Sequence, residues 1–207
     1  MDRCELAFQY HKQGYNCAQS VLMAFSDLTG LAPETGFAMA GGLGGGLGGS
    51  HQEVCGAISG GVMVLGLLYP HTKGEDTATK RQVYGLTKTF LTRFQERFGG
   101  LSCCGDLLRS AIQATPEHTP AAVRLGAKGH CDILIVTAVE VLEELLAEHP
   151  AWKDIPFQMV DESREAALAD TYDYYYVPTY YVGGKKVHEG HAEKCDVEQV
   201  FRLAAEG

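Results

Sequence analysis

The sequence predicts an α+β protein in which an N-terminal helical bundle is followed by a smaller α/β unit. Up to about residue 115, apolar side chains recur at three- and four-residue steps, which is the period of an amphipathic helix. Past Pro120 the chain alternates between short β-type runs and helical segments. The 207 residues suffice for one large domain or two small ones. We expect a helical domain over 1–117, extending to 148 if the helix over 131–148 closes the bundle, and a second domain over 118–207.

Caps and glycines punctuate the helical part. Asn16 is suited to cap a helix that begins at Cys17, because its side chain can accept a hydrogen bond from a free backbone N–H, and Gly30 is suited to end it. Gly99 and Gly100 end the longest periodic stretch. The expected helices cover residues 17–29, 55–68, 77–98 and 104–113.

The second part contains a strong hairpin signal. Gly183-Gly184 links two runs of β-type residues, and such a link favours a hairpin because primed turns need positive φ. The expected order is a strand over 121–127, a helix over 131–148, a strand over 155–160, a helix over 162–170, hairpin strands over 177–182 and 185–188, and a helix over 196–205.

Charge and composition restrict the class of partner. The net charge of −9 argues against nucleic acid and against an anionic membrane surface. No run approaches the roughly 20 apolar residues of a membrane span, and the first five residues do not resemble a secretory signal, so we expect a cytoplasmic protein. The chain holds 25 glycines and 7 cysteines. An odd number of cysteines in a cytoplasmic protein favours redox or metal chemistry over a disulfide framework.

Four cysteines, called here the motif cysteines, are expected at or near helix starts: Cys17, Cys55, Cys104 and Cys131. The unpaired N–H groups of a helix N-terminus lower the pKa of a thiol, and thiolate is both the nucleophile and the metal ligand. Separations of 38, 49 and 27 residues do not fit compact zinc knuckles. Converging from separate helices, the motif cysteines suit a [2Fe–2S] or [4Fe–4S] cluster, or instead two exchangeable disulfides or an electron relay toward Cys131.

The motif cysteines stand in four short sequence elements. These are Gly14-Tyr15-Asn16-Cys17-Ala18-Gln19, Val54-Cys55-Gly56-Ala57-Ile58-Ser59-Gly60, Cys104-Gly105-Asp106-Leu107-Leu108, and Cys131 followed by Ala138 and Leu142-Glu143-Glu144-Leu145. In this order they resemble, over residues 1 to 148, a redox-active family of bacterial proteins named for four spaced cysteines around a C-G-A-x-x-G motif. The resemblance implies a redox role, and related domains of split-Soret cytochromes imply an iron–sulfur cluster at such cysteines. The chain has no C-x-x-C-H sequence, so covalent haem is not expected.

The element order from about 120 to 207 resembles the thioredoxin and glutaredoxin fold. The resemblance rests on the hairpin and on Val177-Pro178-Thr179, which opens it. It implies a cis-proline loop that faces the redox cysteine at the start of the first helix of that fold. Where those proteins carry C-x-x-C, this chain has Cys131 alone. The resemblance therefore leaves a single-thiol role, or a role in binding without catalysis.

Residues 41 to 61 hold ten glycines, and Gly44 to Gly49 satisfies G-x-G-x-x-G. No β-branched strand precedes this run and no Lys-Ser/Thr follows it, so a tightly turned connection is favoured over a phosphate loop. An alternative joins the loop to the cysteines. The N–H groups at Gly49 and Gly56 would then donate to a cluster or an anionic substrate, with His51 as a ligand or a proton donor.

The function expected from the sequence is that of a cytoplasmic redox protein. Its motif cysteines would bind an iron–sulfur cluster for electron transfer with a redox partner protein. One alternative is thiol–disulfide oxidoreduction by the same cysteines, and another is a non-catalytic module that binds a redox partner. The glycine-lined helix over 55–68 also suggests a homodimer. No role is predicted for Cys4, Cys103 or Cys195.

Overall fold

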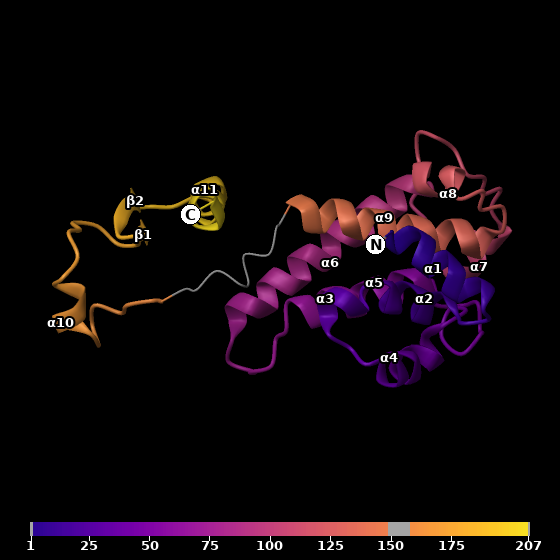
Figure 1. Ribbon diagram of the computed structural model, residues 1–207, viewed down its shortest axis with the longest axis horizontal. Helices are drawn as coiled ribbons and strands as arrows, with labels where there is room; N and C mark the ends of the chain where they lie inside the picture. Colours follow the sequence, from indigo (N-terminus) through magenta and orange to yellow (C-terminus); the bar gives the residue numbers. More distant parts are fainter. Residues whose placement is uncertain (1, 149–157, 207) are drawn as a thin grey trace. The chain divides into compact units, whose positions relative to one another are not determined.

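The computed structural model describes residues 2–148 and 158–206 and divides the chain into two units, Met1–Glu148 and His149–Gly207 (Figure 1). The described residues are mostly helical and include one antiparallel sheet of two strands, so the predicted α+β class is confirmed. Among the helices described, none is both long and apolar enough to cross a membrane.

The N-terminal unit is a bundle of helices, and glycines end several of them as predicted. Gly30 and Gly99 adopt positive φ directly or shortly after a helix ends, a conformation that costs glycine little. The elements are α1 (Arg3–Lys12), α2 (Cys17–Ala24), α3 (Ser26–Thr29), α4 (Pro33–Ala40), the 3-10 helix η1 (Gly41–Leu43), α5 (Gly56–Leu68), α6 (Thr77–Arg97), α7 (Cys104–Arg109), α8 (Pro120–Arg124) and α9 (His130–Glu148).

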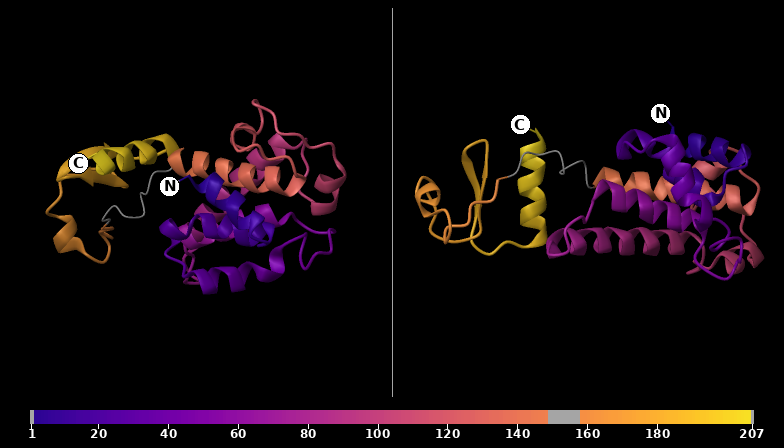
Figure 2. Two further views of the ribbon diagram at one scale, coloured as in Figure 1. Left: turned by 45° about the vertical axis from the view of Figure 1, so that its right-hand side comes forward. Right: turned by 90° about the horizontal axis from the view of Figure 1, so that it is seen from below.

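Helix α9 is the central element of this bundle. Every residue from Asp132 to Val139 is buried, because an almost unbroken apolar run is covered only when other helices pack on all its sides. α9 contacts α1, α2, α5, α6 and α8, and Figures 1 and 2 show it running alongside α1 and α6. The helix predicted over 131–148 therefore packs as part of the N-terminal unit.

Helices α2 and α5 approach each other closely through glycines of α5. A Cβ at Gly60 would lie 2.6 Å from the carbonyl oxygen of Ala18 and 3.0 Å from Val21 Cβ. A Cβ at Gly61 would overlap the ring of Phe90 on α6. The prediction that small residues let this helix approach its neighbours is confirmed, and these neighbours belong to the same chain. The homodimer stays a prediction.

Asn16 caps α2 as predicted. Its side chain accepts a hydrogen bond from Gln19 N–H at 3.0 Å and donates to the carbonyl oxygen of Gly41 at 2.9 Å. Asn16→Ala is expected to lower the free energy of unfolding by about 1–2 kcal/mol, because the cap and the tie to the glycine loop are both lost. Urea unfolding followed by circular dichroism measures this.

A second cap provides the control for the Asn16 prediction. Asp76 caps α6 by accepting from Thr79 N–H at 3.0 Å, and α6 carries none of the motif cysteines. Asp76→Ala should cost about 1 kcal/mol and leave the thiol reactivity of Cys17 unchanged, whereas Asn16→Ala should alter that reactivity. A wild-type unfolding midpoint in Asn16→Ala would contradict the prediction.

The strand predicted over 121–127 is wrong, because α8 occupies the start of this segment. Pro120 takes the first helical position, where its missing N–H and its restricted φ suit a helix start. The Glu140 carboxylate accepts a hydrogen bond from Ala121 N–H at 3.0 Å and so satisfies one of the free donors of the first turn. Ala121 and Ala122 face the core, and a short helix buries them against α9.

Two predicted helices are shorter than the sequence pattern indicates. The segment over 17–29 is divided at Phe25 into α2 and α3. The segment over 104–113 ends as α7 at Arg109, because Ser110 adopts an extended conformation with ψ 156°. Helical periodicity marks the apolar face of each segment, but it does not locate such breaks.

The second unit contains α10 (Ala166–Ala169), β1 (Thr179–Val182), β2 (Lys185–Glu189) and α11 (Lys194–Glu206) within residues 158–206. β1 and β2 form the predicted hairpin, with Thr179 opposite Glu189 and Val182 opposite Lys185. Gly183 and Gly184 have φ of 55° and 78°, as the primed turn requires. The hairpin and the final helix are therefore confirmed.

The remaining predictions for the second unit concern a strand, a helix and the proline loop, and their outcomes differ. The strand over 155–160 lies partly outside the described residues, and 158–160 have no regular structure. The helix over 162–170 shrinks to α10. The Val177–Pro178 peptide bond is cis, as the resemblance implied, and Thr179 begins β1. Within 158–206 the sheet has two strands, so the thioredoxin-like fold stays a prediction.

Candidate functional site

Each of the motif cysteines lies in the first turn of a different helix. Cys17 and Cys104 are the first residues of α2 and α7, Cys131 is the second residue of α9, and Cys55 is the N-cap of α5. The free N–H groups and the partial positive charge of a helix N-terminus favour negative charge at this position. Four helices thus present sulfur where an anion is best tolerated.

Backbone hydrogen bonds hold the starts of α5 and α7 together. Cys55 N–H donates to the carbonyl oxygen of Ser102 at 2.9 Å, and Cys104 N–H donates to that of Glu53 at 2.8 Å. Val54, which precedes Cys55, pairs with Cys103, which precedes Cys104, in an isolated antiparallel bridge. Two cysteines that are 49 residues apart in the sequence are therefore fixed by one short pairing.

Glycines allow the glycine-rich loop and α5 to lie against two of the motif cysteines. A Cβ at Gly46 would be 2.8 Å from Cys104 Cβ, and a Cβ at Gly56 would be 3.0 Å from Cys17 Cβ. A larger residue at either position would displace the cysteine beside it. Gly46 thus lets the loop pack against the start of α7, and Gly56 lets the start of α5 pack against the start of α2.

Cys17 and Cys131 form a close pair. Their Sγ atoms and a ring nitrogen of His11 all lie within 4.8 Å of one another. The hydrogen bond that the Cys17 thiol donates lowers the pKa of Cys131 to about 6, against the opposing effect of burial, and the nearby His11 and His130 rings act in the same direction. The same hydrogen bond, together with burial, raises the pKa of Cys17 well above its usual range. Of the two sulfurs, Cys131 is therefore the one that is favoured as a thiolate.

Cys55 and Cys104 lie near this pair. Among the described residues, however, the group of donor atoms within 4.8 Å of one another contains His11, Cys17 and Cys131 and neither of these two cysteines. Both are buried, with 1% and 5% of their surface exposed. Burial raises the pKa of Cys55 to about 12 and that of Cys104 above its ordinary value, and both thiols are influenced by the charge of Cys131. The structure thus brings all of the motif cysteines into electrostatic range and places two of them at ligand spacing.

His51 lies beside Cys104, with its Nδ1 atom 3.5 Å from Cys104 Sγ. Its carbonyl oxygen accepts a hydrogen bond from Gly105 N–H at 2.8 Å, and its φ of 58° is left-handed, which is strained for histidine. Gly49, the other loop candidate, is exposed and has nothing within 4 Å of its Cβ position. His51 therefore reaches a motif cysteine, whereas Gly49 shapes the turn.

The sequence reasoning missed three residues that support the Cys17–Cys131 pair. Asp132 is 5% exposed and accepts hydrogen bonds from His11 Nδ1 at 2.8 Å and from Lys12 Nζ at 2.7 Å. Burial favours the neutral carboxyl, but the bonds from Lys12 and His11 outweigh it and hold the pKa of Asp132 below its ordinary value. The available signal was helical spacing on α1, where His11 follows buried Cys4 and Ala7 on one face.

The remaining cysteines lie outside this cluster where the structure describes them. Cys4 is buried, and its Sγ faces the carbonyl oxygen of Val136 at 3.7 Å. Cys103 is half-buried, and its Sγ faces the carbonyl oxygen of Gln52 at 3.5 Å. The side chain of Cys195 lies outside the described part of the chain. Cys4 and Cys103 therefore provide controls for experiments on the motif cysteines.

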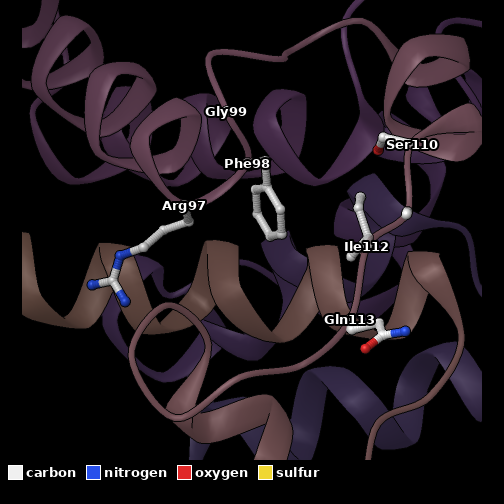
Figure 3. A pocket seen from close by; sticks show the side chains of 7 residues that line it. Arg97, Phe98, Gly99, Ser110, Ile112 and Gln113 are labelled. Carbon is white, nitrogen blue, oxygen red and sulfur yellow. The ribbon is translucent and has the colours of Figure 1, made fainter.

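A shallow cavity of about 220 Å³ lies elsewhere in the N-terminal unit, and none of the motif cysteines lines it (Figure 3). Arg97 at its edge is already engaged, because it donates to the carbonyl oxygen of His118 at 2.7 Å and to the Glu144 carboxylate at 3.0 Å. The lining residues are Arg97, Phe98, Gly99, Ser110, Ala111, Ile112 and Gln113. The candidate site formed by the motif cysteines therefore lies at the helix N-termini, apart from this cavity.

Comparison with known proteins identifies a family for the segment that contains the motif cysteines. Searches of curated proteins and of solved structures gave no match. The model of the family described as "Putative redox-active protein (C_GCAxxG_C_C)" matches residues 15–145, a segment that contains all of the motif cysteines. Because this match covers more than half of the chain, the chain belongs to that redox-active family.

Proposed function

We propose that this protein transfers electrons through an iron–sulfur cluster held by Cys17, Cys55, Cys104 and Cys131. One observation carries the proposal: four sulfurs that are widely separated in the sequence gather at the N-termini of four different helices. Packing alone does not call for this coincidence, because a cysteine that only fills space has no reason to occupy a first turn. An electron-transfer centre also needs a redox partner protein, which belongs to the proposal.

The residues present suit such a cluster. The donor set is rich in thiols, which select iron–sulfur clusters, zinc and Cu(I) over hard cations. Burial raises the pKa of Cys55 and Cys104, so these sulfurs stay protonated without a metal and become thiolates when one binds. When bound, an iron–sulfur cluster supplies one-electron transfer at a potential set by its environment.

The protein's own contribution is to bind, to stabilise negative charge and to exclude water. The helix N-termini stabilise the negative charge that thiolate ligands bring. Cys17, Cys55 and Cys104 are each less than a tenth exposed, so water has little access to their sulfurs. His51 is the exposed group beside Cys104, and it offers a polar path from that cysteine toward solvent.

Anaerobic reconstitution tests the proposal. The purified chain is reduced, incubated with ferrous iron and sulfide, desalted, and assayed for iron, sulfide, visible absorption and electron paramagnetic resonance. We expect roughly two or four iron atoms and as many sulfides per chain, with sulfide-to-iron charge-transfer bands. Protein that keeps its helical circular dichroism but stays colourless and free of iron would exclude the cluster.

A second candidate function is thiol–disulfide exchange by Cys17 and Cys131. The observation that favours it is the closeness of the two Sγ atoms, which lie within 4.8 Å of each other, and the hydrogen bond from Cys17 lowers the pKa of Cys131 to about 6. Cys131 would attack a substrate disulfide, form a mixed disulfide and release one substrate thiolate. Cys17 would then attack Cys131 and release the second thiolate, its proton passing to a leaving group. Two electrons would reach the substrate, and a Cys17–Cys131 disulfide would remain.

The low pKa of Cys131 leads to a measurable pH dependence. In the metal-free reduced protein, alkylation of Cys131 by iodoacetamide should be half-maximal near pH 6, because the thiolate is the reactive form. Peptide mass spectrometry at a series of pH values between about 4 and 9 would follow the modification. The acidic phase should disappear in Cys131→Ser and shift to higher pH in Cys17→Ala, which has no side-chain donor at that position. A Cys131 rate that rises only above about pH 8 would contradict the assignment.

A further inference from the structure

We infer that His11, Cys17 and Cys131 form a binding site for a single thiophilic divalent cation of the zinc class, with Asp132 orienting the histidine. The site shares Cys17 and Cys131 with the proposed cluster and so rests on the same centre. It differs from the cluster because it needs neither sulfide nor the other two motif cysteines. A cation bound there would therefore compete with the cluster.

The spacing of the three donor atoms suits one metal ion. All three lie within 4.8 Å of one another. Two sulfurs bound to a tetrahedral zinc at about 2.3 Å are about 3.8 Å apart, so closing the site requires movements of about 1 Å at most. The donors come from α1, α2 and α9, which contact one another pairwise. The site is thus largely formed before a metal arrives.

Asp132 gives His11 the environment of a metal ligand. Metal-binding histidines commonly donate one ring N–H to a carboxylate, which selects the tautomer and orients the ring. Here His11 Nδ1 lies 2.8 Å from a carboxylate oxygen of Asp132, so Nε2 is the nitrogen left to coordinate. Lys12 bonds the second carboxylate oxygen at 2.7 Å and holds this buried group in place. A histidine with a purely structural role on α1 would not require a buried carboxylate beside two thiols.

The family motif does not contain this site. The family model matches residues 15–145, and His11 lies before that segment. Two thiolates and one imidazole leave a fourth tetrahedral position open, which is the ligand count of catalytic zinc sites. Water or an external thiol would complete the coordination. The structure thus assigns to α1 a ligand that the cysteine pattern does not predict.

Cobalt(II) titration under anaerobic conditions tests this inference, since cobalt replaces zinc and is coloured. We expect one Co²⁺ per chain, with thiolate-to-cobalt charge transfer and the intense d–d bands of tetrahedral coordination. His11→Ala should weaken binding by roughly tenfold or more, and Asp132→Asn by roughly 10–100-fold, as loss of an orienting carboxylate typically does. Zinc should displace the cobalt and should prevent cluster reconstitution.

Two kinds of matched variant serve as controls. His118 is exposed and lies outside the group of donor atoms, and its backbone carbonyl oxygen accepts a hydrogen bond from Arg97 at 2.7 Å, so His118→Ala should bind cobalt like the wild type. Cys55→Ser and Cys104→Ser should also retain the cobalt site, although they should lose the cluster. Circular dichroism of the metal-free variants checks their folding. Should His11→Ala not fold, His11→Asn replaces it, with the same loss of affinity expected.

The outcomes separate this inference from the proposed function. Wild-type cobalt affinity in a folded His11 variant, or a cobalt site that requires Cys55 or Cys104, would overturn the inference and leave the cluster untouched. Failure of cluster reconstitution together with a His11-dependent cobalt site would overturn the cluster and support the inference. Cobalt that gives no charge-transfer band in the wild type would show that the thiols are not ligands and would also overturn the inference.

Discussion

Cys131→Ser is expected to abolish cluster assembly, lowering the iron content after reconstitution by roughly tenfold or more. The reason is geometric as well as chemical. Cys131 Sγ lies within 4.8 Å of Cys17 Sγ, and hydrogen bonding from Cys17 lowers the pKa of Cys131 whereas the pKa of each other motif cysteine is raised. Serine preserves the size of the side chain but does not supply a sulfur ligand. Iron and sulfide assays on anaerobically reconstituted protein measure the effect.

Two adjacent cysteines provide the sharpest control for this experiment. Cys104 is buried at the start of α7, whereas Cys103 is half-buried and faces backbone oxygens. Cys104→Ser should therefore lose the cluster as Cys131→Ser does, and Cys103→Ser should keep it. Wild-type iron content in all three variants would show that Cys104 and Cys131 do not hold the metal.

Gly60→Ala is expected to lower the free energy of unfolding by about 1–3 kcal/mol, even though alanine is the better helix former. The new methyl group would lie 2.6 Å from the carbonyl oxygen of Ala18, which is backbone and cannot rotate away. α2 and α5 would have to separate, and the separation would also move Cys17 relative to Cys55. Urea unfolding measures the stability, and cluster reconstitution measures the effect on the site.

Gly66→Ala in the same helix should raise the free energy of unfolding instead of lowering it. A Cβ at Gly66 has no neighbour within 4 Å, and the residue is exposed. The substitution should therefore stabilise the protein by about 0.5–1 kcal/mol through helix propensity alone, without any effect on the cluster. If Gly60→Ala and Gly66→Ala changed the stability by similar amounts, Gly60 would not be needed for the close approach of α2 and α5.

Much of the fold follows from local sequence. Asn16 caps α2, Gly30 follows α3, and Gly183-Gly184 turns the hairpin, all as predicted. Each of these features depends on interactions within a few residues, where side-chain chemistry directly limits backbone conformation. The same locality explains why the sequence alone predicts that the motif cysteines lie at helix starts.

The errors arose where local preference was weak. Apart from Arg124, residues 121–127 are apolar or small, a composition that suits a buried strand and a buried helix equally. Packing against α9 and the hydrogen bond from Ala121 N–H to Glu140 select the helix. The partner in that hydrogen bond lies 19 residues away, so no local pattern signals it.

The amino-acid order by itself predicted four cysteines at helix starts and the family to which the chain belongs. It did not reveal which sulfurs are paired, because pairing depends on how helices pack. His11 and Asp132 are 121 residues apart and meet where α1 crosses the start of α9. A hydrogen bond between Cys17 on α2 and Cys131 on α9 lowers the pKa of Cys131 and raises that of Cys17, and the nearby His11 ring also lowers the pKa of Cys131. Helix packing thus turns four similar cysteines into a site with one distinct pair and a histidine beside it.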